Sequence, residues 1–304
     1  MVYDIAIIGG GAAGMSAAIY GARGGMSVLV LENTGFGGQV NYTHDVDNYI
    51  GLPKISGSEL ADRMREHAMQ CGGDFRTESV REIKDFMRPV KKLITRQNIY
   101  ETRSVILATG AKPRKLGVAG EDEFSGAGVS YCATCDGAFF RGKTAVVAGG
   151  GNTAFEDALY LAGFCKKVII MNRSNKFRAA KVLVDKAREN PVIEIRTECR
   201  IEKIQGSGSV KSVVTANTVN GRIAVLDTDA VFIAIGRVPE SGLIASAAEL
   251  APDGSVITDE HMRTKTAGIF AAGDVRQTPL RQIITAAADG AVAAESAISY
   301  LTLS

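Results

Sequence analysis

The feature that most constrains the fold is an apolar run that ends in a glycine-rich turn and leads into a helical pattern. It occurs twice. An apolar run without alternation is typical of a buried parallel strand. In both copies, 23 positions separate the first glycine from the residue that closes the next strand, Glu32 or Asn172. The expected strand, turn, helix and strand are residues 3–8, 9–14, 15–22 and 27–31, and again 144–147, 149–154, 155–162 and 168–171. This repeat predicts an α/β protein with two Rossmann-like domains.

The glycine spacing in both turns matches the fingerprint of dinucleotide-binding turns. The first glycine permits a tight turn, the second lets the backbone approach a pyrophosphate, and the third position keeps helix and strand close. Free amide groups at the start of the helix then face the phosphates. The residues expected to bind a cofactor are Gly9, Gly11, Ala12, Ala13 and Gly14, and Gly149, Gly151, Asn152, Thr153 and Ala154. The alternative is a glycine-rich turn that binds nothing, which two copies in the same context disfavour.

The residues that follow the second strand of each copy suggest which dinucleotide is bound. Glu32 can accept hydrogen bonds from both hydroxyls of an unphosphorylated ribose, as in NAD or FAD. The second copy has no acid at this place and reads Asn172, Arg173, Ser174, with Arg178 close behind. Cations suit a 2′-phosphate, so the second site favours NADP. The alternative is that these arginines are solvated loop charges.

The remaining strand-like runs do not form a third nucleotide-binding unit. Residues 230–235 read as a strand that ends in Gly236, and residues 268–274 as a short strand that ends on a buried Asp274. Residues 281–297 are an alanine-rich helical pattern. We expect these last elements to return to the first sheet, which makes the second Rossmann-like domain an insertion into the first.

The chemical centre of the sequence is the motif Cys132-Ala-Thr-Cys135-Asp136. Two cysteines at this spacing can form a redox-active disulfide, and the adjacent aspartate can supply a proton to a leaving thiolate. Half of a zinc site is the alternative, but there is no second such pair. The three histidines, His44, His67 and His261, do not have the spacing of metal ligands. The other cysteines, Cys71, Cys165 and Cys199, are scattered along the chain. We therefore expect no metal site.

Residues 137–144 fit the phosphate-binding pattern G-x-x-x-x-G-K-[ST] letter for letter. Such a loop normally follows a strand and opens a helix. This run instead follows the cysteine pair and leads into the strand expected at 144–147. We therefore interpret the match as accidental.

Composition excludes several other classes. The 304 residues are 46% hydrophobic, with a net charge of +2 from 35 basic and 33 acidic residues, so neither a nucleic-acid partner nor a membrane anchor is expected. The odd number of cysteines, five, does not suit a secreted disulfide framework. A strand-like run from Tyr3 does not read as a signal peptide. We expect a soluble, cytoplasmic protein.

Taken together, these motifs resemble those of the low-molecular-weight thioredoxin reductases over essentially the whole chain. The matching segments are 9–14 with Glu32, 37–39, 48–49, 108–110, 132–136, 149–154, 271–274 and 281–282. The resemblance implies an FAD-binding domain made of residues 1–114 and 242–304. It also implies an inserted NAD(P)H-binding domain of residues 115–241 that carries the cysteine pair.

The resemblance also implies roles for single residues. Asp274 would bind the ribityl or pyrophosphate part of the flavin, and Gln282 would lie beside the isoalloxazine. The other cofactor-binding residues that it implies are Gly38, Gln39, Asn48, Ala108, Thr109, Gly110, Gly236, Gly273 and Arg281.

By the same resemblance, electrons would pass from NADPH through FAD to the Cys132–Cys135 disulfide and then to thioredoxin. Cys135 would be the thiol next to the flavin, Cys132 would attack the partner, and Asp136 would act as acid and base. The protein would be a cytoplasmic homodimer whose domains rotate about linkers near 112–117 and 237–242.

One departure from the family concerns the 2′-phosphate site. The family typically has His-Arg-Arg followed by a further arginine, whereas this chain has Asn172, Arg173, Ser174 and then Arg178. NADPH preference should therefore be weaker, and NADH is a possible donor. One alternative is a related FAD disulfide reductase that uses NADH or ferredoxin or serves another thioredoxin-like partner. The others are a ferredoxin:NADP reductase of this fold, an alkyl hydroperoxide reductase component, and a non-enzymatic NAD(P) sensor.

Overall fold

The structure is a computed structural model that describes residues 1–43 and 45–303, so His44 lies outside it. The chain divides into two compact units. The first consists of Met1–Lys112 and Val238–Ser304, and the second of Pro113–Arg237. The chain passes between them twice, through β9 (Ala111–Pro113) and β18 (Arg237–Pro239), which pair as a separate two-stranded sheet.

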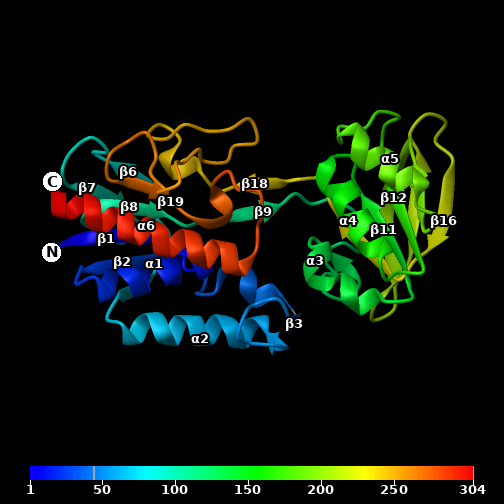
Figure 1. Cartoon of the computed structure of the whole chain (residues 1–304). Helices are drawn as coiled ribbons and strands as arrows, with labels where there is room; N and C mark the ends of the chain where they lie inside the picture. The colour runs from blue at the N-terminus through cyan, green and yellow to red at the C-terminus, as the bar shows by residue number, and fades with distance from the viewer. Residues whose placement is uncertain (44, 304) are drawn as a thin grey trace. The chain divides into compact units, whose positions relative to one another are not determined.

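The first unit is built on a sheet with the order β5-β2-β1-β8-β7-β6, in which β19 also pairs with β8 (Figure 1). The bounds are β1 Val2–Ile8, β2 Val28–Glu32, β5 Asp74–Thr77, β6 Glu82–Lys84, β7 Lys91–Ile94, β8 Ile99–Leu107 and β19 Ile269–Ala271. Strands β1, β2, β5, β8 and β19 are parallel, and β6-β7-β8 are antiparallel. The C-terminal segment therefore returns to the first sheet, which confirms that expectation.

Helices α1 (Ala12–Arg23) and α6 (Ile283–Leu303) pack together in the core beside this sheet (Figure 1). Small residues allow the close approach, because a Cβ at Gly290 would collide with the Ala13 carbonyl group. Helix α2 (Gly57–Gln70) packs on α1. The smaller elements are η1 Gly38–Tyr42, β3 Asp45–Val46, β4 Ile55–Ser56, η3 Gly242–Ile244 and η4 Gly273–Val275.

The second unit has a five-stranded parallel sheet with the order β10-β17-β11-β12-β13 and an antiparallel meander, β14-β15-β16. The strands are β10 Val129–Ser130, β11 Thr144–Ala148, β12 Lys167–Met171, β13 Ile193–Arg196, β17 Ala230–Ile233, β14 Cys199–Gly206, β15 Val210–Asn217 and β16 Ile223–Asp227. The helices are α3 Ala133–Asp136, η2 Gly137–Phe140, α4 Asn152–Ala162 and α5 Lys181–Glu189. The fold-class prediction is confirmed: both units have a Rossmann-like core, and the second is inserted into the first.

Several predicted element bounds were wrong at their ends. Helices α1 and α4 begin at Ala12 and Asn152, directly after the last of the three consecutive glycines in each turn. The sequence predicted that they begin three residues later, at 15 and 155. The strand expected at 268–274 ends at Ala271, because Gly273, with φ +77°, turns the chain into η4. Asp274 therefore lies in a turn and is half-buried instead of ending a strand in the core. The strand expected at 230–235 likewise ends at Ile233.

The C-terminal helix was predicted at 281–297 but spans Ile283–Leu303. Arg281 and Gln282 precede it, and the Thr285 hydroxyl accepts a hydrogen bond from the Gln282 amide. The P-loop-like run proved accidental as expected, since it forms η2 and then opens strand β11 instead of a helix.

Candidate functional site

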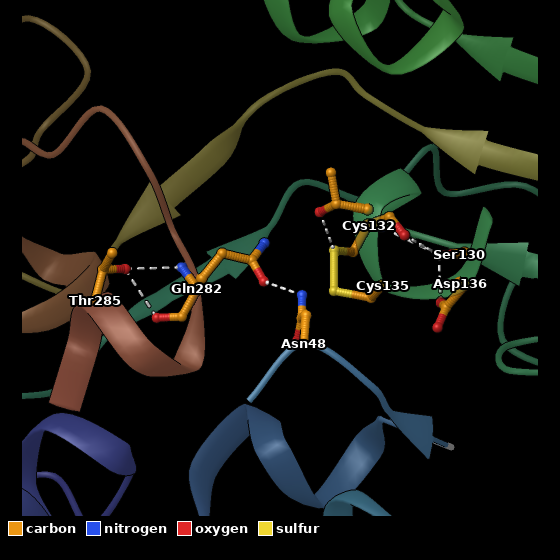
Figure 2. Close-up of a disulfide and its surroundings, with 8 residues drawn as sticks. Asn48, Ser130, Cys132, Cys135, Asp136, Gln282 and Thr285 are labelled. Carbon is orange, nitrogen blue, oxygen red and sulfur yellow. Dashed lines mark hydrogen bonds between the residues drawn. A yellow bond between two sulfur atoms is a disulfide. The ribbon is translucent and has the colours of Figure 1, made fainter. Parts of the chain in front are cut away.

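The second unit holds the Cys132–Cys135 disulfide, with the two Cα atoms 5.3 Å apart (Figure 2). Cys132 immediately precedes α3, and Cys135 lies inside it. The short helix is fixed at its start, since the Asp136 amide donates to the Cys132 carbonyl at 3.1 Å. Both cysteines are partly exposed. The chain can therefore present a disulfide to another molecule without unfolding.

Ser130 is a site residue that the sequence analysis missed. Its buried hydroxyl donates to Asp136 Oδ2 at 2.6 Å and accepts a hydrogen bond from the Cys132 amide at 3.1 Å (Figure 2). One side chain thus holds both the backbone of the first cysteine and the carboxylate expected to move protons. A serine two positions before a turn residue is a signal for such side-chain-to-backbone bonding, but the Asp136 contact depends on how the chain folds back.

The first glycine-rich turn has the geometry of a dinucleotide site. At Gly9, with φ +110°, a Cβ would collide with the Ala108 carbonyl group, and at Gly14 it would collide with Gly9 O. A Cβ added at Gly11 would cause no collision, because the nearest atom, the Gly38 Cα, would lie 4.0 Å away. Space is therefore open in front of Gly11. No side chain caps α1 at Gly11, so its first-turn amides face this open position.

Glu32 lies at the end of β2, as predicted, and its carboxylate is already oriented. The Gly10 amide donates to Glu32 Oε2 at 2.7 Å, and the Thr34 amide donates to Oε1 at 3.0 Å. These bonds hold the acid beside the turn. The Thr34 hydroxyl also donates to Oε1, at 3.4 Å, so Oε2 is the oxygen with a further lone-pair direction for a ribose hydroxyl.

The second turn repeats this arrangement with one difference. A Cβ at Gly149 would collide with Ala234 O, Gly151 has open space around it, and no side chain caps α4. The buried Ala154 fills the third position by packing against Gly149. Asn152, expected to bind cofactor, accepts a hydrogen bond from the Ala180 amide at 2.8 Å and so also fastens the start of α5. Thr153 is exposed in the first turn of α4.

In the loop after β12, the Asn172 side chain contacts the loop's own backbone. This side chain is buried, and its Nδ2 donates to Ser174 O at 2.8 Å and to Lys176 O at 2.9 Å. The Ser174 hydroxyl also donates to Lys176 O, at 2.8 Å. Both side chains therefore fold the loop, because its carbonyl groups would otherwise lack partners.

The cations of this loop are placed differently. Arg173 and Arg178 are exposed. The Arg178 amide donates to Gly150 O at 2.8 Å, which brings this residue to the glycine-rich turn. The loop therefore carries two exposed arginines, of which Arg178 is attached to the second turn through its backbone.

The remaining residues predicted to bind FAD lie around the carboxyl ends of β1, β8 and β19. Asn48 Nδ2 donates to Gln282 Oε1 at 3.0 Å, joining positions 234 apart in sequence (Figure 2). Gln39 Nε2 donates to Ala111 O at 2.6 Å, and the Thr109 hydroxyl donates to Glu240 O at 2.8 Å. The structure thus brings the predicted residues Gly38, Gln39, Asn48, Ala108, Thr109, Gly110, Gly273, Asp274, Arg281 and Gln282 together within the first unit.

Two further predicted residues are engaged by other contacts. Arg281 Nη2 lies 3.7 Å from Asp253 Oδ2. Gly236, with φ +107°, accepts a hydrogen bond from the Arg114 amide where the chain leaves the second unit. The sequence analysis did not identify Asp289 as a residue that supports the site. It is buried and accepts a hydrogen bond at 3.1 Å from the amide of Gly273, one of the predicted residues.

Within the described ranges, 1–43 and 45–303, no three His, Cys, Asp or Glu side chains come together as a metal site. No helix in the same part of the chain is long and apolar enough to cross a membrane.

Comparison with known proteins agrees with this geometry. Residues 3–290 match the family described as pyridine nucleotide-disulphide oxidoreductase. The chain is 43% identical over 307 residues to a thioredoxin reductase from Peptoclostridium acidaminophilum, covering 99% of this chain and 97% of that protein. It is similar to the structure of a thioredoxin reductase from Streptococcus pyogenes, with a TM-score of 0.93, 43% identity, and coverage of 100% of this chain and 99% of that one. For a thioredoxin reductase from Giardia duodenalis the TM-score is 0.93, at 35% identity and 99% coverage of both chains.

Proposed function

We infer that this chain, which belongs to the pyridine nucleotide-disulphide oxidoreductase family, is a thioredoxin-disulfide reductase. The observation that carries this conclusion is the Cys132–Cys135 disulfide with Ser130 and Asp136 hydrogen-bonded beside it. A purely structural disulfide would not need a carboxylate held next to it by a buried hydroxyl. The similarity to thioredoxin reductases over 99% of the chain supports the same activity.

We propose that the two glycine-rich turns bind different cofactors. FAD would be held by residues 1–114 and 242–304, since α1 is uncapped, Gly11 is open and Glu32 is oriented for a ribose. The nicotinamide dinucleotide would be held by residues 115–241, at Gly151 and the first turn of α4. FAD, when bound, supplies a carrier that takes two electrons from a reduced nicotinamide and passes them to a disulfide.

The chain's own residues would then perform thiol–disulfide exchange. The Cys132 thiolate attacks one sulfur of the thioredoxin disulfide, which forms a mixed disulfide and releases the partner's first thiolate. The Cys135 thiolate attacks Cys132 Sγ, which restores the intramolecular disulfide and releases the second thiolate. Asp136 delivers a proton to a leaving thiolate, and Ser130 Oγ, 2.6 Å from Asp136 Oδ2, orients it.

NADPH is the proposed donor, with NADH as a weaker one. Arg173 and Arg178 are exposed in the loop after β12, whereas Asn172 and Ser174 bind the loop's own carbonyl groups. Two cations favour binding of a 2′-phosphate, but they bind it less strongly than the four cationic residues typical of the family. No observation on the chain favours ferredoxin as donor. A homodimer, thioredoxin as the partner and a cytoplasmic location are further parts of this proposal.

The test is to supply the purified yellow protein with NADPH and oxidised thioredoxin and to measure free thiols. The expected result is NADPH-dependent thiol formation that the Cys132→Ser and Cys135→Ser variants both lack. Cys135→Ser should also accumulate a mixed disulfide with thioredoxin through Cys132, because no resolving thiol remains. A colourless protein, or wild-type protein that leaves thioredoxin oxidised, would contradict the assignment.

A further inference from the structure

Glu121 is an almost fully buried carboxylate in the second unit, with an exposed fraction of 2%. Its Oε1 accepts hydrogen bonds from the Leu116 amide at 3.0 Å and from the Tyr131 hydroxyl at 2.7 Å. Its Oε2 accepts from the Gly117 amide at 2.7 Å and the Val118 amide at 3.4 Å. Four donors from two separate stretches of chain therefore converge on one carboxylate.

An anion in this position is retained only because its hydrogen bonds offset the cost of burial. Burial and the hydrogen bond to Glu121 raise the pKa of the Tyr131 phenol. The phenol consequently stays protonated and donates to Glu121 at physiological pH. The Tyr131 ring packs with Leu116 and Val118 against the apolar cluster beneath the meander. The contact is thus a fixed part of the unit.

Tyr131 is the residue directly before Cys132, so this contact bears on the disulfide. The two cysteines are supported in different ways. Cys135 belongs to α3, whose Ala133 lies in the core cluster with Phe155 of α4. Cys132 is the N-cap residue of α3, and its carbonyl accepts the Asp136 amide at 3.1 Å. On its other side it is held by the preceding residues, Ser130 through the Cys132 amide and Tyr131 through Glu121.

We propose that Glu121 and Tyr131 are positioning residues that hold Cys132 against Cys135 and thereby set how readily the disulfide is reduced. Freeing Tyr131 lets Cys132 sample more positions, which lowers the effective concentration of one thiol at the other. The disulfide then becomes easier to reduce. The inference rests on the proposed function only in taking the cysteine pair to be redox-active.

The reaction that measures this is equilibration with glutathione. Two glutathione thiols reduce the Cys132–Cys135 disulfide to two thiols and become one oxidised glutathione, with no other reactant. The reduced fraction is read by alkylating the thiols and resolving the products by mass. We expect Tyr131→Phe to shift the equilibrium constant toward the dithiol by about three- to tenfold, and tenfold corresponds to about 30 mV for a two-electron couple.

The matched control is Tyr100→Phe. In the first unit, the Tyr100 hydroxyl donates to Glu78 Oε1 at 2.7 Å, the same contact at the same distance but remote in sequence from the cysteines. It should lower the Tm, by less than Tyr131→Phe because Glu78 is less buried than Glu121, while leaving the glutathione equilibrium unchanged. A Tyr131→Phe equilibrium within the error of wild type would overturn the proposal, even if its Tm falls.

Glu121→Gln tests whether the pair acts as a unit. The glutamine side chain has the size of the glutamate side chain, but an NH₂ group replaces one of its two oxygens. That NH₂ group cannot accept the hydrogen bonds that the oxygen accepted. The double variant should then shift the equilibrium no further than the larger single variant, because both remove the same constraint. Additive shifts would refute the coupling. A failure of this test in a protein that still reduces thioredoxin with NADPH removes only this inference. Wild-type protein that leaves thioredoxin oxidised removes the proposed function.

Discussion

The Arg276 guanidinium forms two hydrogen bonds to the Asp289 carboxylate, Nε to Oδ2 at 2.6 Å and Nη2 to Oδ1 at 2.9 Å. Both side chains are largely buried, and Asp289 also accepts a hydrogen bond from the Gly273 amide. Helix α6 thereby fixes the turn that carries Asp274, the residue expected to bind the flavin. Removing one partner of a buried ion pair leaves the other unpaired and costs about 3–5 kcal/mol.

Arg276→Met should therefore weaken retention of FAD as well as stability. The expected result is a lower ratio of flavin to protein absorbance after gel filtration, with FAD affinity reduced at least about tenfold, equal to about 1.4 kcal/mol. Arg63→Met is the control, because Arg63 pairs with Glu59 at the exposed surface of α2, where ion pairs contribute little. Equal flavin retention in both variants would show that the ion pair has no part in cofactor binding.

Ser130→Ala should slow thioredoxin reduction while leaving the fold intact. The variant loses the hydroxyl that holds the Asp136 carboxylate and the Cys132 amide. A hydrogen bond to a charged group contributes about 1.5–3 kcal/mol, so we expect kcat to fall by roughly ten- to a hundredfold. Ser130→Thr keeps the hydroxyl and should recover most of the activity. If alanine and threonine variants behave alike, Ser130 only fills space.

Arg173→Ala should affect the two nicotinamide donors unequally. Only NADPH carries the phosphate that Arg173 is proposed to bind, so kcat/KM should fall about ten- to a hundredfold for NADPH and stay nearly constant for NADH. Arg200→Ala, which removes an exposed arginine paired with Glu202 in the same unit, is the control. Wild-type protein that prefers NADH, or equal losses with both donors, would exclude the proposed phosphate site.

Asp157→Asn should stabilise the protein most at neutral and higher pH. Burial, with repulsion from Glu156, raises the pKa of Asp157 from 3.8 to about 7 in the folded state. The native state then binds this proton more tightly than the unfolded state, so stability declines as pH rises through that range and is constant above it.

The amide substitution removes this decline. Its gain in unfolding free energy should be about 2–3 kcal/mol larger at pH 8 than at pH 5, measured by urea denaturation. Asp62→Asn, at an exposed position of α2, provides the comparison and should show no such difference. A gain for Asp157→Asn that is identical at the two pH values would contradict a raised pKa.

The sequence by itself determined the features that depend on near neighbours. Gly14 is required because a Cβ there would collide with the Gly9 carbonyl oxygen in the same turn, and this steric demand shows in the spacing of the turn. The apolar runs of β1 and β11 lack alternation because both faces are buried. Cys132 and Cys135 are brought together by one helical turn, so their pairing needs only local geometry.

Tertiary structure decided the contacts between residues distant in sequence. Neither the Asn48–Gln282 hydrogen bond nor the Arg276–Asp289 pair leaves a periodic signal, because each depends on where separate elements end. The sequence likewise did not show that the buried Asn172 amide binds the Ser174 and Lys176 carbonyl groups, because these contacts depend on how the loop folds. The hydrogen bonds of Ser130 to Asp136 and of Tyr131 to Glu121 also depend on the tertiary structure. A buried polar side chain must bind the partners that the fold places within reach, and the sequence does not show which these are.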